Sequence, residues 1–160
     1  TMTDLSIGDA APDFTAPATL KSKISLSDYK GQKLVLYFYP KDDTSGCTKE
    51  ACGFEENLAA FNDAGVAVVG VSKDPIKSHE KFTEKYGLTF PLISDEEGAI
   101  CEAYGVWVEK SMYGRKYMGI ERATFLIDAD GNIEQIWRKV KVPGHVDAVI
   151  AAATGQAEAA

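Results

Sequence analysis

Two short apolar runs in the first half of the chain restrict its fold more than any other feature. Residues 33–39 (KLVLYFY) end at Pro40, and residues 66–71 (VAVVGV) end in a polar stretch. Both runs are rich in β-branched or aromatic residues and are apolar at consecutive positions. Strands buried on both faces have this pattern, and they are typical of parallel sheets that helices cover on each side. The pattern predicts an α/β fold.

Four further segments carry helical signals, namely residues 47–62, 75–86, 96–104 and 145–153. Apolar residues recur at helical spacing in the first of them. The second begins beside Asp74 and Pro75 and stops at Gly87, a residue that commonly follows the last turn of a helix. Strand and helix signals therefore alternate through the first half of the chain.

A different pattern follows in the second half. Two apolar runs, residues 123–127 and 133–140, flank the turn residues 130–132 (DGN), which predicts a β-hairpin. The whole chain of 160 residues has the length of one domain and contains no repeat or linker. We therefore expect a single domain, residues 1–160, with a central mixed β-sheet flanked by helices. The sheet is expected to be parallel in its first half and antiparallel at one edge.

Charge and composition argue against several classes of protein. The net charge of −7 disfavours nucleic-acid binding, which depends on clustered lysines and arginines. The sequence has no apolar run long enough for a membrane span and no signal-peptide pattern. Three cysteines are too few for a secreted disulfide framework, so a reducing, cytoplasmic location is expected. Thr1, which precedes Met2, is expected to be an expression remnant, and residues 155–160 a flexible tail.

The stretch PKDDTSGCTKEAC, residues 40–52, holds two of the three cysteines. Such a pair serves as a metal half-site, a structural disulfide, or a nucleophile with its reducing partner. Cys47 falls where a strand has ended and a helix begins, so free backbone N–H groups and the helix dipole favour its thiolate. In this kind of environment the pKa of a cysteine falls from about 8.5 to between about 3.5 and 7.5. Position alone therefore indicates a nucleophile, and Thr44 can place a hydroxyl beside its sulfur.

Cys52 follows Cys47 by five positions, and the geometry of a helix constrains the pair. On an intact helix their Cα atoms would lie about 8.6 Å apart, on faces about 140° apart. A disulfide requires less than about 7 Å. A permanent disulfide is therefore not expected, whereas a disulfide that forms when the first turns unravel is compatible with the spacing.

The segment PKDDTSGCTKEACGF resembles the active-site segment of peroxiredoxins, whose signature Pro-x-x-x-Thr/Ser-x-x-Cys is met here by Pro40, Thr44 and Cys47. The Cys-x4-Cys spacing is similar to that of the peroxiredoxin Q, or bacterioferritin comigratory protein, class. The resemblance extends to residues 8–17 (GDAAPDFTAP), to residues 104–128 and to DGNI, and so covers nearly the whole domain. Ser45 departs from the pattern, because close family members usually carry proline there.

The resemblance implies a thioredoxin-like fold and a thiol-dependent peroxidase without metal or organic cofactor. Cys47 would attack hydrogen peroxide or an organic hydroperoxide, and Cys52 would resolve the resulting sulfenic acid as a disulfide. Thr44 would hydrogen-bond the peroxide and the thiolate, Arg122 would stabilise the thiolate and the developing charge, and Pro40 would shield the sulfur. Thioredoxin or a similar dithiol would reduce the disulfide, and the chain would act as a monomer or weak homodimer.

Two other functions use the same Cys47 chemistry. A dithiol–disulfide oxidoreductase is one, although the usual Cys-x-x-Cys motif is absent. The other is a peroxide sensor or chaperone-like binding module that passes its oxidation to a partner.

Several residues have simpler interpretations. Cys101 is expected to be a packed apolar residue, and His79 and His145 to be surface or packing residues. Metal ligation is not expected, because zinc sites need paired ligand spacings. Glu50 can bridge to an active-site arginine or cap the first helical turn, and we favour the cap. Trp107, Tyr113 and Tyr117 can form a pocket rim or pack in the core or at an edge, and we favour packing.

Overall fold

The computed structural model describes residues 5–155, so the expectations for Thr1 and for residues 156–160 lie outside the described residues. A five-stranded sheet with the order β5-β4-β3-β8-β9 forms its centre. Its strands are β3 (Lys33–Phe38), β4 (Val66–Ser72), β5 (Leu92–Ser94), β8 (Ala123–Ile127) and β9 (Ile133–Trp137). Strands β3, β4 and β5 run parallel, whereas β8 is antiparallel to β3 and β9 is antiparallel to β8. The predicted mixed sheet and its hairpin at residues 128–132 are confirmed.

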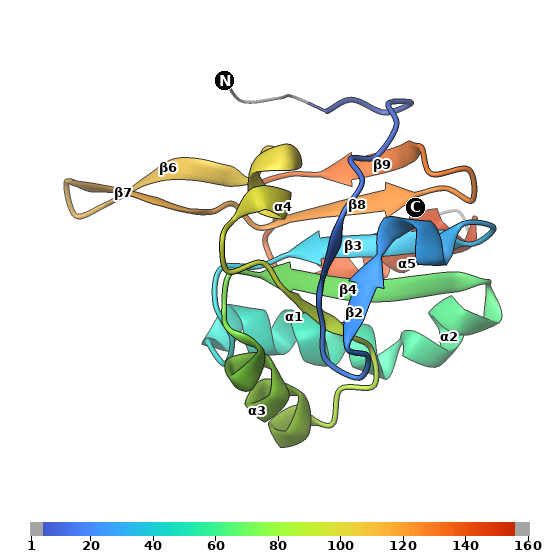
Figure 1. Cartoon of the computed structure of the whole chain (residues 1–160), viewed down its shortest axis with the longest axis horizontal. Coiled ribbons are helices and arrows are strands. Elements are labelled where there is room, and N and C mark those ends of the chain that lie inside the picture. The colour runs from blue at the N-terminus through green and yellow to red at the C-terminus, as the bar shows by residue number, and fades with distance from the viewer. Residues whose placement is uncertain (1–4, 156–160) are drawn as a thin grey trace.

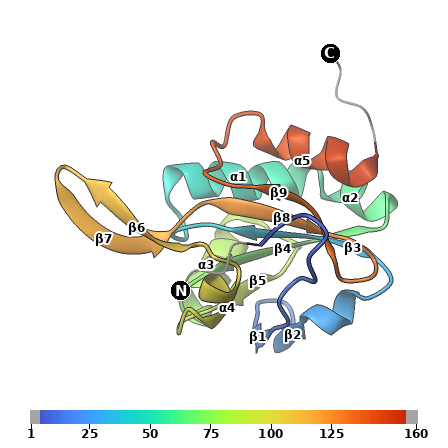
Figure 2. The ribbon, with the colours of Figure 1, turned by 90° about the horizontal axis from the view of Figure 1, so that it is seen from above.

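Helices cover both faces of this sheet, as the apolar runs predicted. They are α1 (Ser45–Glu56), α2 (Leu58–Asp63), α3 (Ile76–Tyr86), α4 (Ala99–Ala103) and α5 (His145–Thr154). Figure 2 shows α1, α2 and α5 on one side of the sheet and α4 on the other, together with the N-terminal hairpin of β1 (Thr15–Pro17) and β2 (Lys23–Ser25). A single 3-10 turn, η1 (Leu26–Tyr29), leads from that hairpin to β3.

The side chains of β3 show why the run is apolar throughout. Leu34, Leu36 and Phe38 belong to the core under α4 and the N-terminal hairpin. Val35 and Tyr37 belong to the second core, beneath α1, α2 and α5. Because successive side chains of a strand point to opposite faces, a central strand with helices on both sides must be apolar at every position.

Several predicted boundaries differ from the structure. The helix expected over residues 47–62 begins two residues earlier and is interrupted at Asn57, whose side-chain amide donates to the Gly53 carbonyl at 2.9 Å. The helix expected over residues 96–104 is shortened to α4, and the strand expected to reach residue 140 ends at Trp137. Strands β1, β2 and β5 are only three residues long, too short to give a periodic signal.

A two-stranded arm, β6 (Trp107–Met112) and β7 (Arg115–Ile120), was not predicted as strands. It projects from the body beside α4 (Figure 1). Tyr113 at its turn is 98% exposed and Tyr117 is 44% exposed, so neither packs in the core. The far end of the arm lies beyond the sheet and has no second layer to cover it, so these two tyrosines remain in solvent. Trp107, at the base of the arm, is half-buried against the core, as expected. Among residues 5–155, no helix is long and apolar enough to cross a membrane.

Candidate active site

Cys47 is the third residue of α1, directly after the loop that leaves β3. Its side chain is only 2% exposed and packs with Ala51, Phe54 and Leu58 in the core beneath α1. Thr44, the residue before the helix, is extended (φ −93°, ψ 157°), so α1 starts at Ser45 and the backbone N–H groups of its first turn have no partner within the helix. The predicted position of Cys47 at a helix start, on the apolar side, is confirmed.

Arg122 reaches Cys47 because of the register between two antiparallel strands. Phe38, the last residue of β3, pairs with Ala123, the first residue of β8, so residue 122 lies at the edge of the sheet from which α1 starts. There the Arg122 guanidinium donates from Nη2 to Cys47 Sγ at 3.1 Å. A Cβ on residue 46 would lie 3.3 Å from Nη2, so Gly46 allows this close approach. The structure thus brings together two residues that are 75 positions apart.

Glu50 is the second partner of Arg122, and the expectation that it caps the helix was wrong. Its Oε1 accepts from Arg122 Nη1 at 2.5 Å, and its side chain is fully buried one turn after Cys47. Burial raises the pKa of Glu50 to about 7, although the charge of Arg122 and its hydrogen bond act in the opposite direction. Among the described residues, its other oxygen, Oε2, has no hydrogen-bond partner.

Arg122 therefore donates hydrogen bonds to two acidic groups, the Glu50 carboxylate and the Cys47 sulfur. Burial lowers the pKa of Arg122, but the neighbouring charges of Glu50 and Cys47 outweigh that effect, and the net pKa is raised above its ordinary value. The arm adds a second cation that was not predicted, Lys110 of β6. Burial lowers the pKa of Lys110, and the nearby charge of Arg122 lowers it further. A buried sulfur next to an arginine that stays charged is suited to hold a thiolate.

Thr44 and Pro40 lie on the loop before the helix, and the hydrogen bond expected between Thr44 and the Cys47 sulfur is not formed. The Thr44 hydroxyl donates to the Lys41 carbonyl at 3.0 Å, which leaves its oxygen lone pairs available to accept from a ligand. Both side chains are exposed. The loop thus forms an outer wall of the site, whereas Arg122 and Glu50 lie beneath it.

Cys52 lies on the same unbroken helix as Cys47, and neither cysteine is in a disulfide. Its side chain is half-buried, away from the apolar stripe of α1, as predicted. Burial raises the pKa of the Cys52 thiol above its ordinary 9.0, and the charges of Glu56 and Glu55 raise it further. Cys52 is therefore kept in the thiol form at neutral pH.

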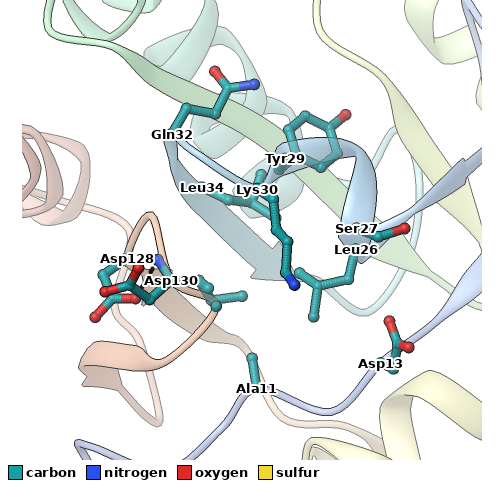
Figure 3. Close-up of a pocket in the computed structure, with 12 residues that line it drawn as sticks. Ala11, Asp13, Leu26, Ser27, Tyr29, Lys30, Gln32, Leu34, Asp128 and Asp130 are labelled. Atoms are coloured by element: carbon teal, nitrogen blue, oxygen red, sulfur yellow. Dashed lines mark hydrogen bonds between the residues drawn. The ribbon is translucent and has the colours of Figure 1, made fainter.

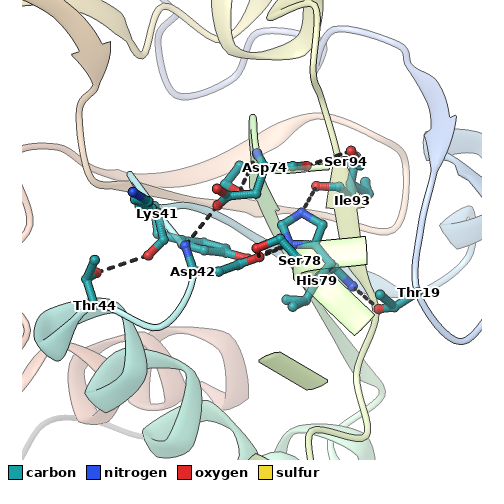
Figure 4. A network of polar contacts seen from close by, with 12 residues as sticks. Thr19, Lys41, Asp42, Thr44, Asp74, Ser78, His79, Ile93 and Ser94 are labelled. Carbon is teal, nitrogen blue, oxygen red and sulfur yellow. Dashed lines mark hydrogen bonds and ion pairs between the residues drawn. The ribbon is translucent and has the colours of Figure 1, made fainter. Parts of the chain in front are cut away.

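A buried polar network holds the start of the same loop. Figure 4 shows Asp42 at its centre, between Asp74 and His79. Asp42 accepts from Tyr39 Oη at 2.6 Å and from Ser78 Oγ at 2.8 Å, and its other contact is with His79 Nδ1 at 2.7 Å. His79 Nε2 lies 2.9 Å from the Ile93 carbonyl, to which it donates. We refer to Tyr39, Asp42, Asp74, Ser78 and His79 as the Asp42 network.

Asp42, Asp74 and His79 also have potential metal-ligating atoms within 4.8 Å of one another. These atoms are already committed to hydrogen bonds, because Asp74 Oδ2 accepts from the Asp42 amide at 2.8 Å and from Ser72 Oγ at 2.7 Å. The donor set therefore fits a structural anchor better than a cation site. His79 is fully buried, so of its two predicted roles packing is confirmed and surface exposure is not.

The remaining candidates are structural. His145 lies 2.8 Å from Thr124 Oγ1, and burial, followed by the charge of Arg122, lowers its pKa to about 4, so it is neutral at physiological pH. Cys101 is fully buried on α4, as expected for a packed residue, and burial raises the pKa of its thiol well above the ordinary value. A pocket of about 290 Å³ lies at the other end of the strands, lined by Leu34 and Asp128 among others, and contains none of the candidate residues (Figure 3).

Comparison with known proteins adds independent evidence. The family model described as the AhpC/TSA family matches residues 7–136. A putative peroxiredoxin Bcp from Coxiella burnetii is 53% identical over 146 residues, which are 91% of this chain and 97% of that protein. Peroxiredoxin Bcp from Escherichia coli is 45% identical over 93% of this chain and 96% of its own length.

Solved structures agree with these relatives. A variant of PrxQ from Xylella fastidiosa superimposes with a TM-score of 0.91 at 42% identity, covering 98% of this chain and 99% of that one. A structure of the Xanthomonas campestris bacterioferritin comigratory protein, described for its alkyl peroxide reduction activity, gives a TM-score of 0.85 at 46% identity, with 89% and 90% covered. The shared mixed sheet and flanking helices confirm the predicted thioredoxin-like fold.

Proposed function

The chain belongs to the AhpC/TSA family and is a thiol-dependent peroxidase of the peroxiredoxin Bcp type, and we propose that Cys47 is its peroxidatic cysteine. The hydrogen bond of 3.1 Å from Arg122 to Cys47 Sγ is the observation that carries this assignment. Of the three cysteines, Cys47 has a guanidinium on its sulfur and a position at a helix start, and these two features favour the thiolate. Cys101 and Cys52 have thiol pKa values raised by burial, which opposes the role of the cysteine that attacks the peroxide.

In the first step, an electron pair of the Cys47 thiolate attacks the terminal oxygen of R–O–OH. The S–O bond forms while the O–O bond breaks, and the products are Cys47 sulfenic acid and RO⁻, which takes up a proton to leave as an alcohol or water. Sulfur is oxidised by two electrons and the peroxide is reduced by two. Charge moves from sulfur to the leaving oxygen, so a fixed guanidinium beside both atoms stabilises the whole path.

We assign supporting roles to Thr44, Pro40 and Glu50 from their hydrogen bonds and their positions around the sulfur. The Thr44 hydroxyl, which donates to Lys41, can accept a hydrogen bond from the peroxide O–H and so orient the O–O bond. Pro40 would limit the access of water to the sulfur from the outer wall. Glu50 would position Arg122, since it holds the other half of the guanidinium.

We propose Cys52 as the resolving cysteine. Its thiol displaces water from the sulfenic acid, so that Cys47–SOH and Cys52–SH give the disulfide and H₂O, with no further oxidant. The disulfide is then reduced by an external dithiol, for which thioredoxin is our proposal, and this need for reductant supports a cytoplasmic location. Organic hydroperoxides are proposed as substrates beside hydrogen peroxide, since the Xanthomonas relative is described for alkyl peroxide reduction. We propose a monomer or weak homodimer, because one chain supplies every residue of the site.

The test is peroxide consumption coupled to thioredoxin in the parent, Cys47→Ser and Cys52→Ser, with Cys101→Ala as the matched control. We expect Cys47→Ser to be inactive, Cys52→Ser to lose turnover with thioredoxin, and Cys101→Ala to keep the parental rate. Peroxidase activity in Cys47→Ser would refute the assignment of the nucleophile. Normal turnover of Cys52→Ser would refute the assignment of the resolving residue alone.

A further inference from the structure

The resolving step faces a geometric obstacle, because α1 keeps both cysteines on one continuous helix. At the spacing of an ideal helix their Cα atoms lie about 8.6 Å apart, beyond the reach of about 7 Å for a disulfide. Part of α1 must therefore unwind before Cys47 and Cys52 can bond. The contacts around the helix determine which part can do so.

The C-terminal half of α1 is held firmly. Ala51 and Phe54 are fully buried beneath it. Glu55 accepts two hydrogen bonds from Thr89, one from the backbone amide and one from the hydroxyl, both at 2.7 Å. Unwinding this half would expose core side chains and break both bonds, so the helix is expected to open at its N-terminal end.

The N-terminal end is held by much less. Residues 43–45 are exposed, and the N-cap residue Thr44 makes no side-chain capping bond, because its hydroxyl is directed to Lys41. The charged bond from Arg122 to Cys47 weakens once oxidation converts the thiolate to a neutral sulfenic acid. After that step, the first turn depends on whatever else holds residues 43–46.

Besides the burial of the Cys47 side chain, the hydrogen bonds of Asp43 remain to hold this segment. Its carboxylate accepts from Lys85 Nζ at 2.8 Å and from Tyr86 Oη at 2.7 Å, both at the end of α3. Among the described residues, these are the only recorded side-chain hydrogen bonds that join residues 43–46 to another element. We refer to Asp43, Lys85 and Tyr86 as the latch.

Backbone strain acts against the latch. Asp43 has a φ of 58°, a left-handed conformation that is unfavourable for residues other than glycine and is tolerated best by aspartate and asparagine. Its neighbour Asp42 is fixed in the buried Asp42 network, so the chain cannot relieve this strain by moving upstream. Release of the Asp43 carboxylate allows φ to relax, and the relaxation frees the chain on the side of Cys47.

From these contacts we propose that the latch is a positioning device for the resolving step. It keeps the first turn of α1 wound and so limits the rate at which Cys47 sulfenic acid and Cys52 form their disulfide and water. The Lys85 and Asp43 side chains are 58% and 42% exposed, so the latch is weak enough to open in each cycle. This inference depends on the proposed roles of Cys47 and Cys52.

The latch also sets how the sulfenic acid is partitioned. A second peroxide oxidises it further to sulfinic acid unless the resolving thiol reaches it first. A tight latch slows resolution and favours this overoxidation, whereas a loose latch protects the enzyme. The proposal therefore predicts opposite changes in the rate of disulfide formation and in the yield of sulfinic acid.

The test uses full-length Tyr86→Phe and Lys85→Met, which each remove one bond to Asp43. Tyr86→Phe retains the ring that packs against Phe82. Lys81→Met is the control, since Lys81 is an exposed lysine of α3 with no recorded hydrogen bond or ion pair among the described residues. Reduced protein is mixed rapidly with hydrogen peroxide, at one equivalent to follow disulfide formation and at a fixed excess to follow sulfinic acid. The thiol, sulfenic, disulfide and sulfinic forms are measured by mass spectrometry of quenched samples.

We expect each latch variant to form the disulfide about 2- to 10-fold faster, the effect of losing one such hydrogen bond. The sulfinic acid formed at a fixed peroxide excess should fall by a similar factor, while the rate of Cys47 oxidation stays at the parental value. Disulfide formation at the parental rate in both variants, or equal acceleration in Lys81→Met, would overturn the proposal.

A Cys52→Ser background separates resolution from access to the sulfur. Without the resolving thiol, the latch variants should form sulfinic acid as fast as the parent. A change in that background would show that the latch governs access of peroxide to Cys47, and would also overturn the proposal. If the parent itself forms no Cys47–Cys52 disulfide, the proposed function fails together with the latch, and this outcome is distinct from failure of the latch alone.

Discussion

Replacement of Glu50 by glutamine tests the electrostatics at the base of the site. Burial raises the pKa of Glu50 from an ordinary 4.5 to about 7. Since the folded pKa is the higher one, ionisation of Glu50 opposes folding. The penalty is absent below pH 4.5, grows as the pH rises from 4.5 to about 7, and is constant above that range. At about 1.36 kcal/mol for each pH unit, the full penalty is about 3 kcal/mol. About 2 kcal/mol of it falls between about pH 5.5 and about pH 8.5.

Glutamine keeps an oxygen that accepts from Arg122 but has no ionisation to penalise. The free energy of unfolding of Glu50→Gln, minus that of its parent, should therefore increase by about 2 kcal/mol from about pH 5.5 to about pH 8.5. Urea unfolding at several pH values measures this difference, with both proteins in a Cys47→Ser background so that no thiol lies beside Arg122. Glu56→Gln, at an exposed position of α1, controls for the substitution itself. A Glu50→Gln difference that stays constant over the pH range would refute the reasoning.

Three further predictions concern the reaction steps. Arg122→Lys should lower the second-order rate constant for Cys47 oxidation by about 10- to 100-fold in stopped-flow measurements, because an ammonium cannot serve two partners as the planar guanidinium does; a parental rate would contradict this. The rate of disulfide formation should rise about tenfold per pH unit from pH 7 until the raised pKa of Cys52 is reached. Glu56→Gln should accelerate disulfide formation at pH 7, because the charge of Glu56 raises that pKa. A rate that does not change with pH would show that formation of the Cys52 thiolate is not limiting. Ser45→Pro should slow disulfide formation and raise the free energy of unfolding by about 0.4–1 kcal/mol. The reason is that Ser45 is the first residue of α1 and Thr44 already has the extended backbone that proline requires before it. Quenched-flow mass spectrometry measures the rate and urea unfolding the stability, and faster disulfide formation would contradict the prediction.

The sequence alone was sufficient for the main layers of the fold. Strands β3, β4 and β8 are buried on both faces, so their apolar runs were unmistakable, and Gly87 ends α3 in the left-handed conformation that favours glycine. The arm of β6 and β7 was missed because its exposed, mixed side chains lack the alternation that burial imposes on a strand. A pattern of burial predicts only the segments that are buried.

The site was predicted in part, and for a clear reason. The place of Cys47 at a helix start followed from local signals, whereas Arg122 was assigned only through the family resemblance, because its proximity is created by strand pairing. Glu50 was misjudged because a glutamate in the first turns of a helix is usually exposed. Its burial depends on an arginine that comes from another strand. The latch has no local signal either, since Asp43 and Lys85 meet only after α3 has packed.

The pairing of Phe38 with Ala123 also has a consequence for which changes of length the chain can accept. The distance from Arg122 to the sulfur is set by strand register and not by the chain between them. A residue inserted within β8 would shift the register between Arg122 and the rest of the strand, so that either Arg122 or the later residues of β8 would turn to the opposite face of the sheet. A residue inserted at the exposed turn of the arm, around Gly114, would leave that distance unchanged. Insertions and deletions among related sequences are therefore expected in the turn of the arm and not in the interior of β8.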